Sequence, residues 1–327
     1  MPKRLLFIHN SETSFVKIDL KIVTNWFDVQ NLCLNKLKLF KPLFIANSVK
    51  RSDIVFIWFS SWFSFLPILF AKLYAKPVVL VTGGYDTANV PMADYGNQRH
   101  FLKRFITNWN IKHASKLILN SQYIYKELSE LLPSEIHKAH VVHHGIEPIL
   151  PSISKDKKIV LNIGNVSHEN LHRKGLLPFV KIAKYLPEFE FVQIGAWRDN
   201  AIHQLQSIAT ENVKFLGRVS DEELIKNMQS ASVYLQLSLH EAFGMSVIES
   251  MQYGASPVVS NHGALAEVVN QHGIVVKDFM PLTLVNAIQN ADSASYQDRL
   301  DLQKFVNTNY SIQQRKDAFQ KILAQWI

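Results

Sequence analysis

The chain has 327 residues, of which 47% are hydrophobic and 19% charged, so it is long enough for two domains with large cores. Its single cysteine, Cys33, excludes an intramolecular disulfide and fits a reducing compartment, which predicts a cytoplasmic protein. Residues 1–150 carry 18 Lys and Arg against 10 Asp and Glu, whereas residues 151–327 carry 17 against 17, so the net charge of +8 belongs to the first half. This asymmetry predicts an anionic partner for the first half, such as a membrane surface or a phosphate-bearing substrate.

The start of the chain, MPKRLLFIHNSE, has the basic onset of a signal peptide, but its apolar run ends at Ile8, so it predicts a first β-strand. The segment from Ile54 to Tyr74 is apolar enough to suggest a transmembrane helix. Three serines and a proline interrupt it, and a strand-like run precedes a helix-like run that leads into PVVLVT. We therefore predict a buried β-α-β unit here rather than a membrane span.

Short β-branched or aromatic runs alternate with helical segments along both halves. They are LLFIH, PLFIA, DIVFIW, PVVLVT, KLILN and AHVVHH in the first half, and KIVLNIG, FEFVQIG, VKFLG, SVYLQLS, SPVVS and GIVV in the second. This alternation predicts an α/β fold with one doubly wound parallel sheet in each half.

The stretch EPILPSISKDKK, residues 147–158, has the prolines, serines and charges of an interdomain linker. We predict a first Rossmann-like domain over residues 1–148 and a second over residues 149–305. A helical segment without strands begins near Tyr296. Its last part, residues 306–327, is predicted as a C-terminal helix that could pack back toward the first domain.

A basic segment without acidic residues runs from residue 95 to residue 126. Its basic residues are Arg99, Lys103, Arg104, Lys112, Lys116 and Lys126, and its apolar residues at helical spacing are Phe101, Leu102, Phe105, Ile106 and Trp109. A basic amphipathic helix with aromatic residues can lie on an anionic membrane surface. The alternative is that the apolar arc packs on the first sheet, and both can hold if the helix is exposed.

The stretch GNVSHENLHRKGLLPFVKIAKYL contains the first candidate phosphate site. A predicted strand ends at Gly164, a polar loop follows, and Lys174 begins an amphipathic helix. A basic residue at the carboxyl end of a parallel strand, beside a helix start, is well placed to hold a phosphate. Taken alone, the stretch fits a solvated pair of Arg173 and Lys174 better.

The stretch HEAFGMSVIESMQYGASPVV makes a stronger case. It predicts a turn at residues 240–243, a helix from about Gly244 to Tyr253, and a left-handed helix cap at Gly254. Gly244 lets the backbone approach a ligand closely. The backbone N–H groups of Gly244, Met245 and Ser246 would point out of the helix start at an anion, which predicts a diphosphate site.

Two glutamates flank this helix start at different places. Glu241 lies in the turn, whereas Glu249 lies more than one turn into the helix, so they do not share a face. A carboxylate at Glu249 can accept two hydroxyl hydrogen bonds, which suits a ribose or a hexose. The alternative is that Glu249 pairs with a nearby Lys or Arg.

At this point the sequence resembles a known family. The run SLHEAFGMSVIESMQYGASPVVS is similar to the E-x7-E signature of the retaining glycosyltransferases of family 4. The similarity continues at LILNSQYIYKEL, VVHHGIE, VKFLGRVSDEELIKNMQSASVYL and HGALAEVV. The resemblance implies a GT-B fold, in which two Rossmann-like doubly wound parallel-sheet domains face a cleft. It also implies transfer of a hexose from a nucleotide-diphosphate sugar to a glycan or lipid-linked acceptor, with retained configuration, in surface polysaccharide or glycolipid synthesis.

The resemblance also implies roles for the site residues. Glu249 would hold the ribose, Lys174 would neutralise the diphosphate, and Glu241 would hold the donor sugar together with the backbone of Phe243, Gly244, Met245 and Ser246. In the family a basic residue directly follows the glycine at the end of this domain's first strand. Here Asn165 follows Gly164, and Arg173 could take the place of the missing basic residue.

A second departure from the family lies at the fourth strand of the first domain. Many relatives end this strand with a histidine that faces the donor sugar, whereas this chain has Gly83, Gly84, Tyr85 and Asp86. The glycines would allow a close backbone approach to the donor, and Asp86 could bind or deprotonate an acceptor hydroxyl. The alternative is an ordinary glycine turn with an aspartate cap.

No Asp-x-Asp motif follows a strand, and the acidic cluster at Asp221, Glu222 and Glu223 follows Ser220 as in a capped helix start. We therefore expect no metal and no other cofactor, with Lys174 and helix dipoles stabilising the leaving group. Two other functions remain open: a sugar-nucleotide epimerase of the same fold, and a non-catalytic subunit that binds nucleotide sugars. The basic half lacks a nucleic-acid-binding module, so we expect no nucleic-acid partner. We expect a cytoplasmic protein that is at most peripheral on the inner face of a membrane.

Overall fold

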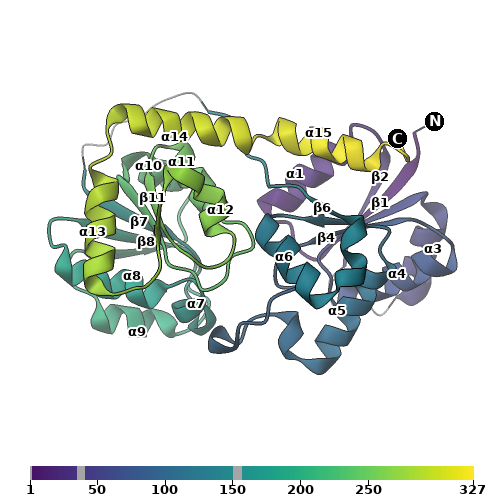
Figure 1. Ribbon diagram of the computed structural model, residues 1–327. Helices are drawn as coiled ribbons and strands as arrows, with labels where there is room; N and C mark the ends of the chain where they lie inside the picture. The colour runs from purple at the N-terminus through teal and green to yellow at the C-terminus, as the bar shows by residue number, and fades with distance from the viewer. Residues whose placement is uncertain (1, 35–40, 150–156) are drawn as a thin grey trace. The chain divides into compact units, whose positions relative to one another are not determined.

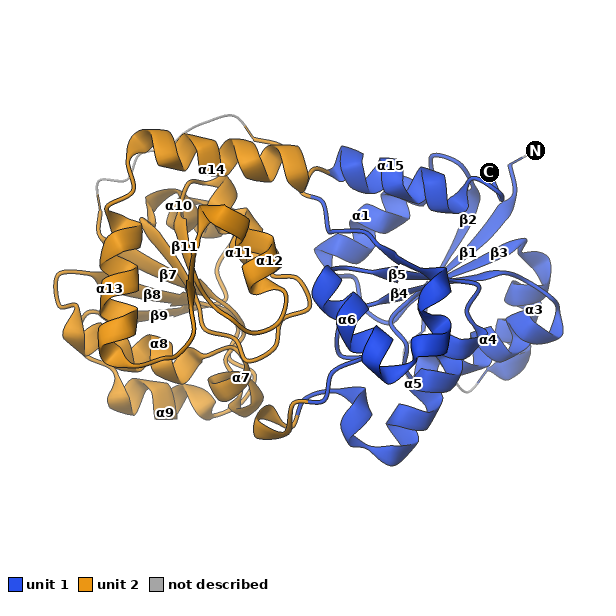
Figure 2. Ribbon diagram, in the orientation of Figure 1, with its two compact units in different colours: residues 1–89, 95–145, 312–327 blue, residues 90–94, 146–311 orange. Residues whose placement is uncertain are grey.

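The computed structural model describes residues 2–34, 41–149 and 157–327 (Figure 1). The chain forms two compact units (Figure 2). Unit 1 comprises Met1–Asn89, Tyr95–Gly145 and Ile312–Ile327, and unit 2 comprises Val90–Asp94 and Ile146–Ser311. Most of the predicted linker, residues 150–156, lies outside the described residues.

Unit 1 is built on a six-stranded parallel sheet with the order β2-β1-β3-β4-β5-β6. Its strands are β1 (Arg4–His9), β2 (Asp28–Cys33), β3 (Ile54–Trp58), β4 (Val78–Thr82), β5 (Lys116–Leu119) and β6 (Ala139–Val141). Strands β3 and β4 are buried along their whole length, as expected for strands that are covered on both faces. The chain order reverses between β1 and β3, and doubly wound sheets bind ligands at the carboxyl edge of such a switch point.

Helices cover both faces of this sheet (Figure 1). They are α1 (Ser14–Val23), α3 (Pro42–Arg51), α4 (Trp62–Leu73), α5 (Phe101–His113), α6 (Gln122–Leu131) and α15 (Ile312–Leu323). On one face, Val16 of α1 and Phe319 of α15 pack in one core cluster with Phe56 and Trp58 of β3. The C-terminal helix α15 is therefore part of the core of unit 1.

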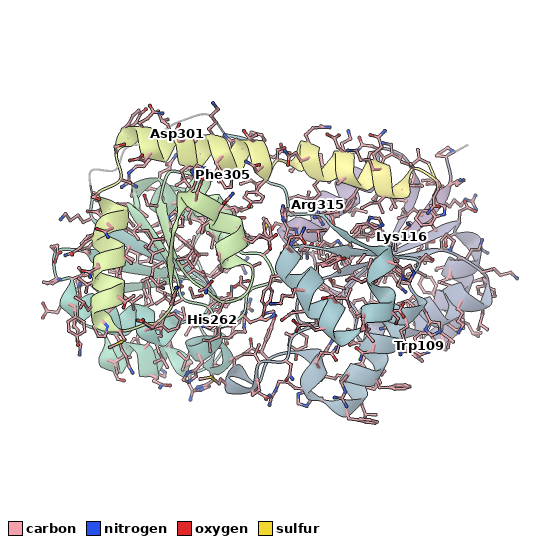
Figure 3. All side chains as sticks on the ribbon, viewed as in Figure 1. Trp109, Lys116, His262, Asp301, Phe305 and Arg315 are labelled. Carbon is pink, nitrogen blue, oxygen red and sulfur yellow. The ribbon has the colours of Figure 1, made fainter. Side chains whose placement is uncertain are left out.

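A buried ion pair fastens α15 to α1. Arg315, labelled in Figure 3, pairs with Asp19 at 2.6 Å, and the two side chains are 1% and 0% exposed. Two further guanidinium hydrogen bonds, each 2.8 Å, go to the carbonyls of Val142 and His143. The buried charges are thus paired and hydrogen-bonded, which is the condition under which burying them is tolerated.

The apolar segment from Ile54 to Tyr74 forms β3 and α4, and PVVLVT continues as β4. The predicted β-α-β unit is therefore confirmed. Among the residues that the structure describes, no helix combines the length and the apolar character needed to cross a membrane.

One predicted strand of unit 1 is wrong. The run PLFIA, residues 42–46, is the start of α3, with Pro42 at a first-turn position where its missing N–H costs nothing. The actual second strand, β2, has the sequence DVQNLC and was not predicted. It is an edge strand that pairs with β1 alone and is mostly exposed or half-buried, so it lacks the continuous apolar run of a central strand.

Unit 2 repeats this architecture with the strand order β12-β11-β10-β7-β8-β9, again parallel throughout. Its strands are β7 (Ile159–Ile163), β8 (Glu190–Ile194), β9 (Val213–Gly217), β10 (Val233–Gln236), β11 (Ser256–Ser260) and β12 (Ile274–Val276). Its helices are α7 (His168–Arg173), α8 (Leu176–Ile182), α9 (Ala201–Ile208), α10 (Asp221–Ser230), α11 (Met245–Gln252), α12 (Leu265–Val269), α13 (Pro281–Asp292) and α14 (Tyr296–Asn309). The predicted pair of doubly wound α/β sheets is confirmed, and the switch point of unit 2 lies between β7 and β10.

Apart from the short segment Val90–Asp94, which belongs to unit 2, the chain passes from unit 1 to unit 2 after Gly145 and returns after Ser311. Ile146 is already buried in a core of unit 2, and its N–H donates to the carbonyl of Tyr310 at 2.8 Å. Val306 and Tyr310 are buried in the same core. The predicted helix over residues 306–327 is in fact two pieces, because α14 ends at Asn309 and α15 begins at Ile312.

Candidate functional site

The candidate site lies at the carboxyl edge of the unit 2 sheet, where β7 and β10 are neighbours. The loop and short helix after β7 are held against the segment after β10, because the N–H of Leu239 donates to the carbonyl of Arg173 at 2.8 Å. Gly175 has φ +67°, and a Cβ there would clash with the carbonyl of Leu237. Two stretches far apart in the sequence therefore meet at the switch point.

Lys174 and Glu241 form an ion pair at this meeting point. Their Nζ–Oε2 distance is 3.1 Å, and the side chains are 19% and 17% exposed. The stem of Lys174 passes over Gly164, where a Cβ would lie 3.2 Å from Lys174 Cδ. Burial acts to raise the pKa of Glu241, but the charges of Lys174 and Arg173 outweigh it and lower the pKa. Both members of the pair are therefore charged, and both remain partly accessible to a ligand.

Arg173 and Asn165 lie beside this pair with their side chains engaged. The guanidinium of Arg173 bonds to Glu169 at 2.9 Å and to Asn170 at 2.6 Å. Asn165 accepts from the N–H of Ala196 at 3.2 Å. The positive charge of Arg173 helps to lower the pKa of Glu241. These two hydrogen bonds of its guanidinium are made within α7 and stabilise that helix.

The start of α11 has the geometry expected of an anion site. Gly244 has φ 110°, and a Cβ there would lie 2.8 Å from Leu265 Cδ2, so only glycine fits without strain. No described residue accepts a hydrogen bond from the backbone N–H of Gly244, Met245 or Ser246. Phe243 contributes only its backbone, because its ring is buried against Tyr310. The left-handed cap predicted at Gly254, with φ 79°, is confirmed.

Glu249 lies further along α11 and has no ion pair within the described parts of the chain, which excludes the predicted alternative of a Lys or Arg partner there. Burial alone raises the pKa of its carboxyl to about 7. Its acceptor capacity is therefore open for a ligand hydroxyl.

A polar network that the sequence analysis missed links these groups. The hydroxyl of Tyr234 donates to Gln236 at 2.9 Å and lies 2.8 Å from that of Ser246. Gln236 donates to Ser238 at 2.6 Å, and Ser238 donates to Glu241 at 3.4 Å. In the sequence, Tyr234, Gln236 and Ser238 stand at every second position along and just after a buried strand. This spacing puts their three polar side chains on one face and could have indicated the network.

The glycine loop of unit 1 has a different character. Asp86 is 1% exposed, and its two oxygens accept from the N–H groups of Ser60 at 2.5 Å and Gly83 at 2.6 Å. Burial raises its pKa to about 6 although these backbone hydrogen bonds act to lower it. Gly84 has φ 95°, as a glycine turn requires. These contacts favour the alternative of an ordinary turn, in which Asp86 holds the loop together.

The apolar arc of α5 is divided. Ile106 is buried, and Trp109, labelled in Figure 3, stacks on His113 with ring centroids 4.1 Å apart. Phe101, Leu102 and Phe105 are 71%, 61% and 60% exposed. The basic helix therefore packs through its later turns and exposes apolar side chains at its start.

The acidic cluster at residues 221–223 starts α10, and Ser220 caps it by accepting from the N–H of Glu223 at 3.2 Å, as predicted. Within residues 2–34, 41–149 and 157–327, no group of three or more His, Cys, Asp or Glu side chains could hold a metal ion.

Two solved structures share this fold over nearly the whole chain. The crystal structure of Anabaena Alr3699/HepE in complex with UDP and glucose matches with a TM-score of 0.80 at 15% identity, covering 98% of this chain and 99% of that one. The lipopolysaccharide outer core galactosyltransferase WaaB in its apo form matches with a TM-score of 0.73 at 14% identity, covering 99% and 100%. At such identities the likeness shows the fold alone, and that fold is GT-B.

The family model for glycosyl transferases group 1 matches residues 150–304. A relative, the O-antigen chain mannosyltransferase B of Escherichia coli, is 26% identical over 168 residues, which is 50% of this chain and 40% of the relative. The chain thus aligns with less than half of that relative's length. The family match thus covers residues 150–304, slightly less than half of the chain, and the resemblance drawn from the motifs is confirmed over them.

Proposed function

We propose that the protein is a retaining glycosyltransferase that moves a hexose from a nucleotide-diphosphate sugar to a glycan or lipid-linked acceptor. The observation that carries the proposal is the combination at one sheet edge of three features. These are the Lys174–Glu241 pair, the unpaired N–H groups at the start of α11, and the unpaired carboxylate of Glu249. Each suits a different part of one nucleotide sugar.

The roles follow from the chemistry of each group. Glu249 accepts hydrogen bonds from the ribose hydroxyls, because its carboxylate has no protein donor among the described residues. The N–H groups of residues 244–246 bind the diphosphate. Lys174 neutralises the charge on the leaving diphosphate, and Glu241, held by Lys174 and Ser238, accepts from hydroxyls of the donor sugar.

In the proposed reaction the bond between the sugar's anomeric carbon and the diphosphate oxygen breaks. The acceptor oxygen bonds to the same face of that carbon, and its proton passes to the departing diphosphate. Catalysis is then mainly positioning and stabilisation of the leaving group, with no metal and no other cofactor required. Asp86 takes no part as a base, because both of its oxygens already hold the loop.

The proposed pathway class is surface polysaccharide or glycolipid synthesis, supported by the names of an O-antigen mannosyltransferase and a lipopolysaccharide galactosyltransferase among the similar proteins. We also propose that the protein is cytoplasmic and binds the inner face of an anionic membrane through the exposed, basic start of α5. Replacing Arg99, Lys103 and Arg104 together by Ala should weaken sedimentation with anionic vesicles, and unchanged sedimentation would contradict this part of the proposal.

A panel of nucleotide sugars tests the main proposal. The true donor should raise the thermal unfolding midpoint of the purified protein, since a ligand that binds only the folded state stabilises it. Incubation with that donor alone distinguishes the alternatives: an epimerase would give an epimer, and a binding subunit would give no turnover with any acceptor.

Lys174→Ala should lower the rate of transfer at least about a hundredfold. The matched control is Lys214→Ala, which breaks the exposed Lys214–Glu190 pair of the same unit, 2.7 Å long. Equal activity in the two variants would refute the assignment of Lys174.

A further inference from the structure

One residue of unit 1 adopts a backbone conformation that its side chain disfavours. Phe59, directly after β3, has φ 72° in the left-handed region. The other non-glycine residues with positive φ in the described part of the chain are Ala75, Asp94 and Asn270, which are small or of types that tolerate this region. A bulky aromatic residue there is strained, and such strain persists mainly at functional sites.

Several contacts hold Phe59 in this conformation. Its N–H donates to the carbonyl of Val81 at 2.9 Å, and the N–H of the next residue, Ser60, donates to Asp86. Asp86 also binds the N–H of Gly83, and a Cβ on Gly83 would overlap the Phe59 ring. The buried aspartate and the glycine therefore both serve to place this ring.

The ring lies at the carboxyl edge of the sheet, beside the switch point between β1 and β3. Phe15, from the first turn of α1, contacts it edge-on with ring centroids 6.3 Å apart. Phe15, Phe59 and Tyr85 are all half-buried, and they come from the segments that follow β1, β3 and β4. Half-buried aromatic rings at this edge suit a ligand with a flat apolar face.

We propose that Phe59 is a specificity-determining residue whose ring packs on the apolar face of a pyranose ring in the acceptor. This rests on the proposed function, which places the donor in unit 2 and so leaves the switch point of unit 1 for the acceptor. A flat aromatic ring matches the flat apolar face of a pyranose better than it matches a flexible lipid chain, so we assign the acceptor's sugar as the partner.

The test uses the whole protein with its donor and a prenyl diphosphate hexose as the acceptor, and free prenyl diphosphate as a competitive inhibitor. Phe59→Leu keeps the bulk and loses the ring, so the KM for the acceptor should rise about tenfold. The Ki of prenyl diphosphate and the rate of donor hydrolysis should not change. Phe59→Tyr, which keeps the ring, should keep the wild-type KM.

A second pair of variants separates strain from packing. Phe59→Gly should raise the KM while the thermal unfolding midpoint stays near that of the wild type, because relief of strain offsets the lost ring contacts. Ala75→Gly relieves strain at an exposed residue that precedes β4, at the opposite end of that strand from Gly83, so it should raise the midpoint by about 2 °C and leave the KM unchanged.

An unchanged KM in Phe59→Leu would overturn the inference, and so would an equal rise in the Ki of prenyl diphosphate, which would place the lipid on the ring. If Phe59→Gly fails to fold, the leucine and tyrosine variants still decide. A wild-type protein that transfers to no acceptor would instead overturn the proposed function, and this inference with it.

Discussion

The carboxyl edges of the two sheets share a topology but differ in chemistry. In unit 2 the switch point gathers an ion pair, unpaired N–H groups and an unpaired carboxylate, all able to meet a charged ligand. In unit 1 the carboxylate at the sheet's carboxyl edge, Asp86, is satisfied by backbone hydrogen bonds, and half-buried aromatic rings, Phe15 and Phe59, lie beside it. The same scaffold can thus present either charge or apolar surface, depending on whether the polar groups at the edge are satisfied internally.

The largest expected effect belongs to the buried ion pair that holds α15 in unit 1. Arg315→Ala leaves the carboxyl of Asp19 buried without its partner, which should lower the free energy of unfolding of unit 1 by about 3–5 kcal/mol. Chemical denaturation followed by tryptophan fluorescence would measure it. A loss no greater than that of Lys214→Ala, an exposed pair worth at most about 1 kcal/mol, would contradict the role of the buried pair.

Charge at the unit 2 edge is the next target. Glu241→Gln keeps the size of the side chain but removes the partner of Lys174, so transfer should fall by about 10²–10³ while the unfolding midpoint changes little. Steady-state kinetics with the identified donor would measure this. Normal kcat and KM in the variant would show that the pair is structural only.

The matching change in unit 1 should act on stability instead. Asp86→Asn has one oxygen fewer to accept from Ser60 and Gly83, so the free energy of unfolding should drop by about 1–3 kcal/mol. Its activity at a temperature where it is folded should stay within about threefold of the wild type apart from a raised acceptor KM. A large loss of kcat without loss of stability would restore Asp86 as a candidate base.

Glu249 predicts a pH dependence of both stability and ligand affinity in unit 2. Burial raises its pKa to about 7 from 4.5, so the folded state binds more protons than the unfolded state between these values. Ionisation of Glu249 therefore lowers the free energy of unfolding as the pH rises from about 4.5 to 7. At pH 8 the Glu249→Gln variant should be more stable than the wild type.

Nucleotide affinity should run in the opposite direction. The ionised carboxylate accepts ribose hydroxyls, so binding of the donor's nucleoside diphosphate should tighten by up to about tenfold per pH unit below 7 and then level off. Calorimetry at pH 6 and pH 8 would measure it, with Glu249→Gln expected to bind weakly and equally at both. An equal pH dependence in that variant would assign the effect to another group.

The smallest expected effect concerns the buried network of unit 2. Tyr234→Phe removes the hydroxyl between Gln236 and Ser246 and should cost about 1 kcal/mol, which is a several-fold rise in donor KM. Tyr310→Phe is the control, because it removes another buried hydroxyl of unit 2 that bonds to the carbonyl of Val268 at 3.0 Å. The control should lose similar stability and keep its KM. A matching KM rise in both variants would show a general packing effect.

Local sequence determined much of this protein. Continuous apolar runs predicted the central strands, because a strand covered on both faces can carry few polar residues, and Gly254 marked the end of α11, because a left-handed cap favours glycine. The edge strand β2 escaped prediction, since exposure frees its composition from any apolar pattern.

Only the tertiary structure decided which groups meet. Lys174 and Glu241 lie 67 residues apart, and parallel pairing of β7 with β10 brings them within 3.1 Å. Tertiary burial also decided the state of each carboxylate. Asp86 is engaged because two N–H groups converge on it, and Glu249 is open because none does among the described residues. Convergence of this kind depends on long-range packing, which spacing along the chain does not encode.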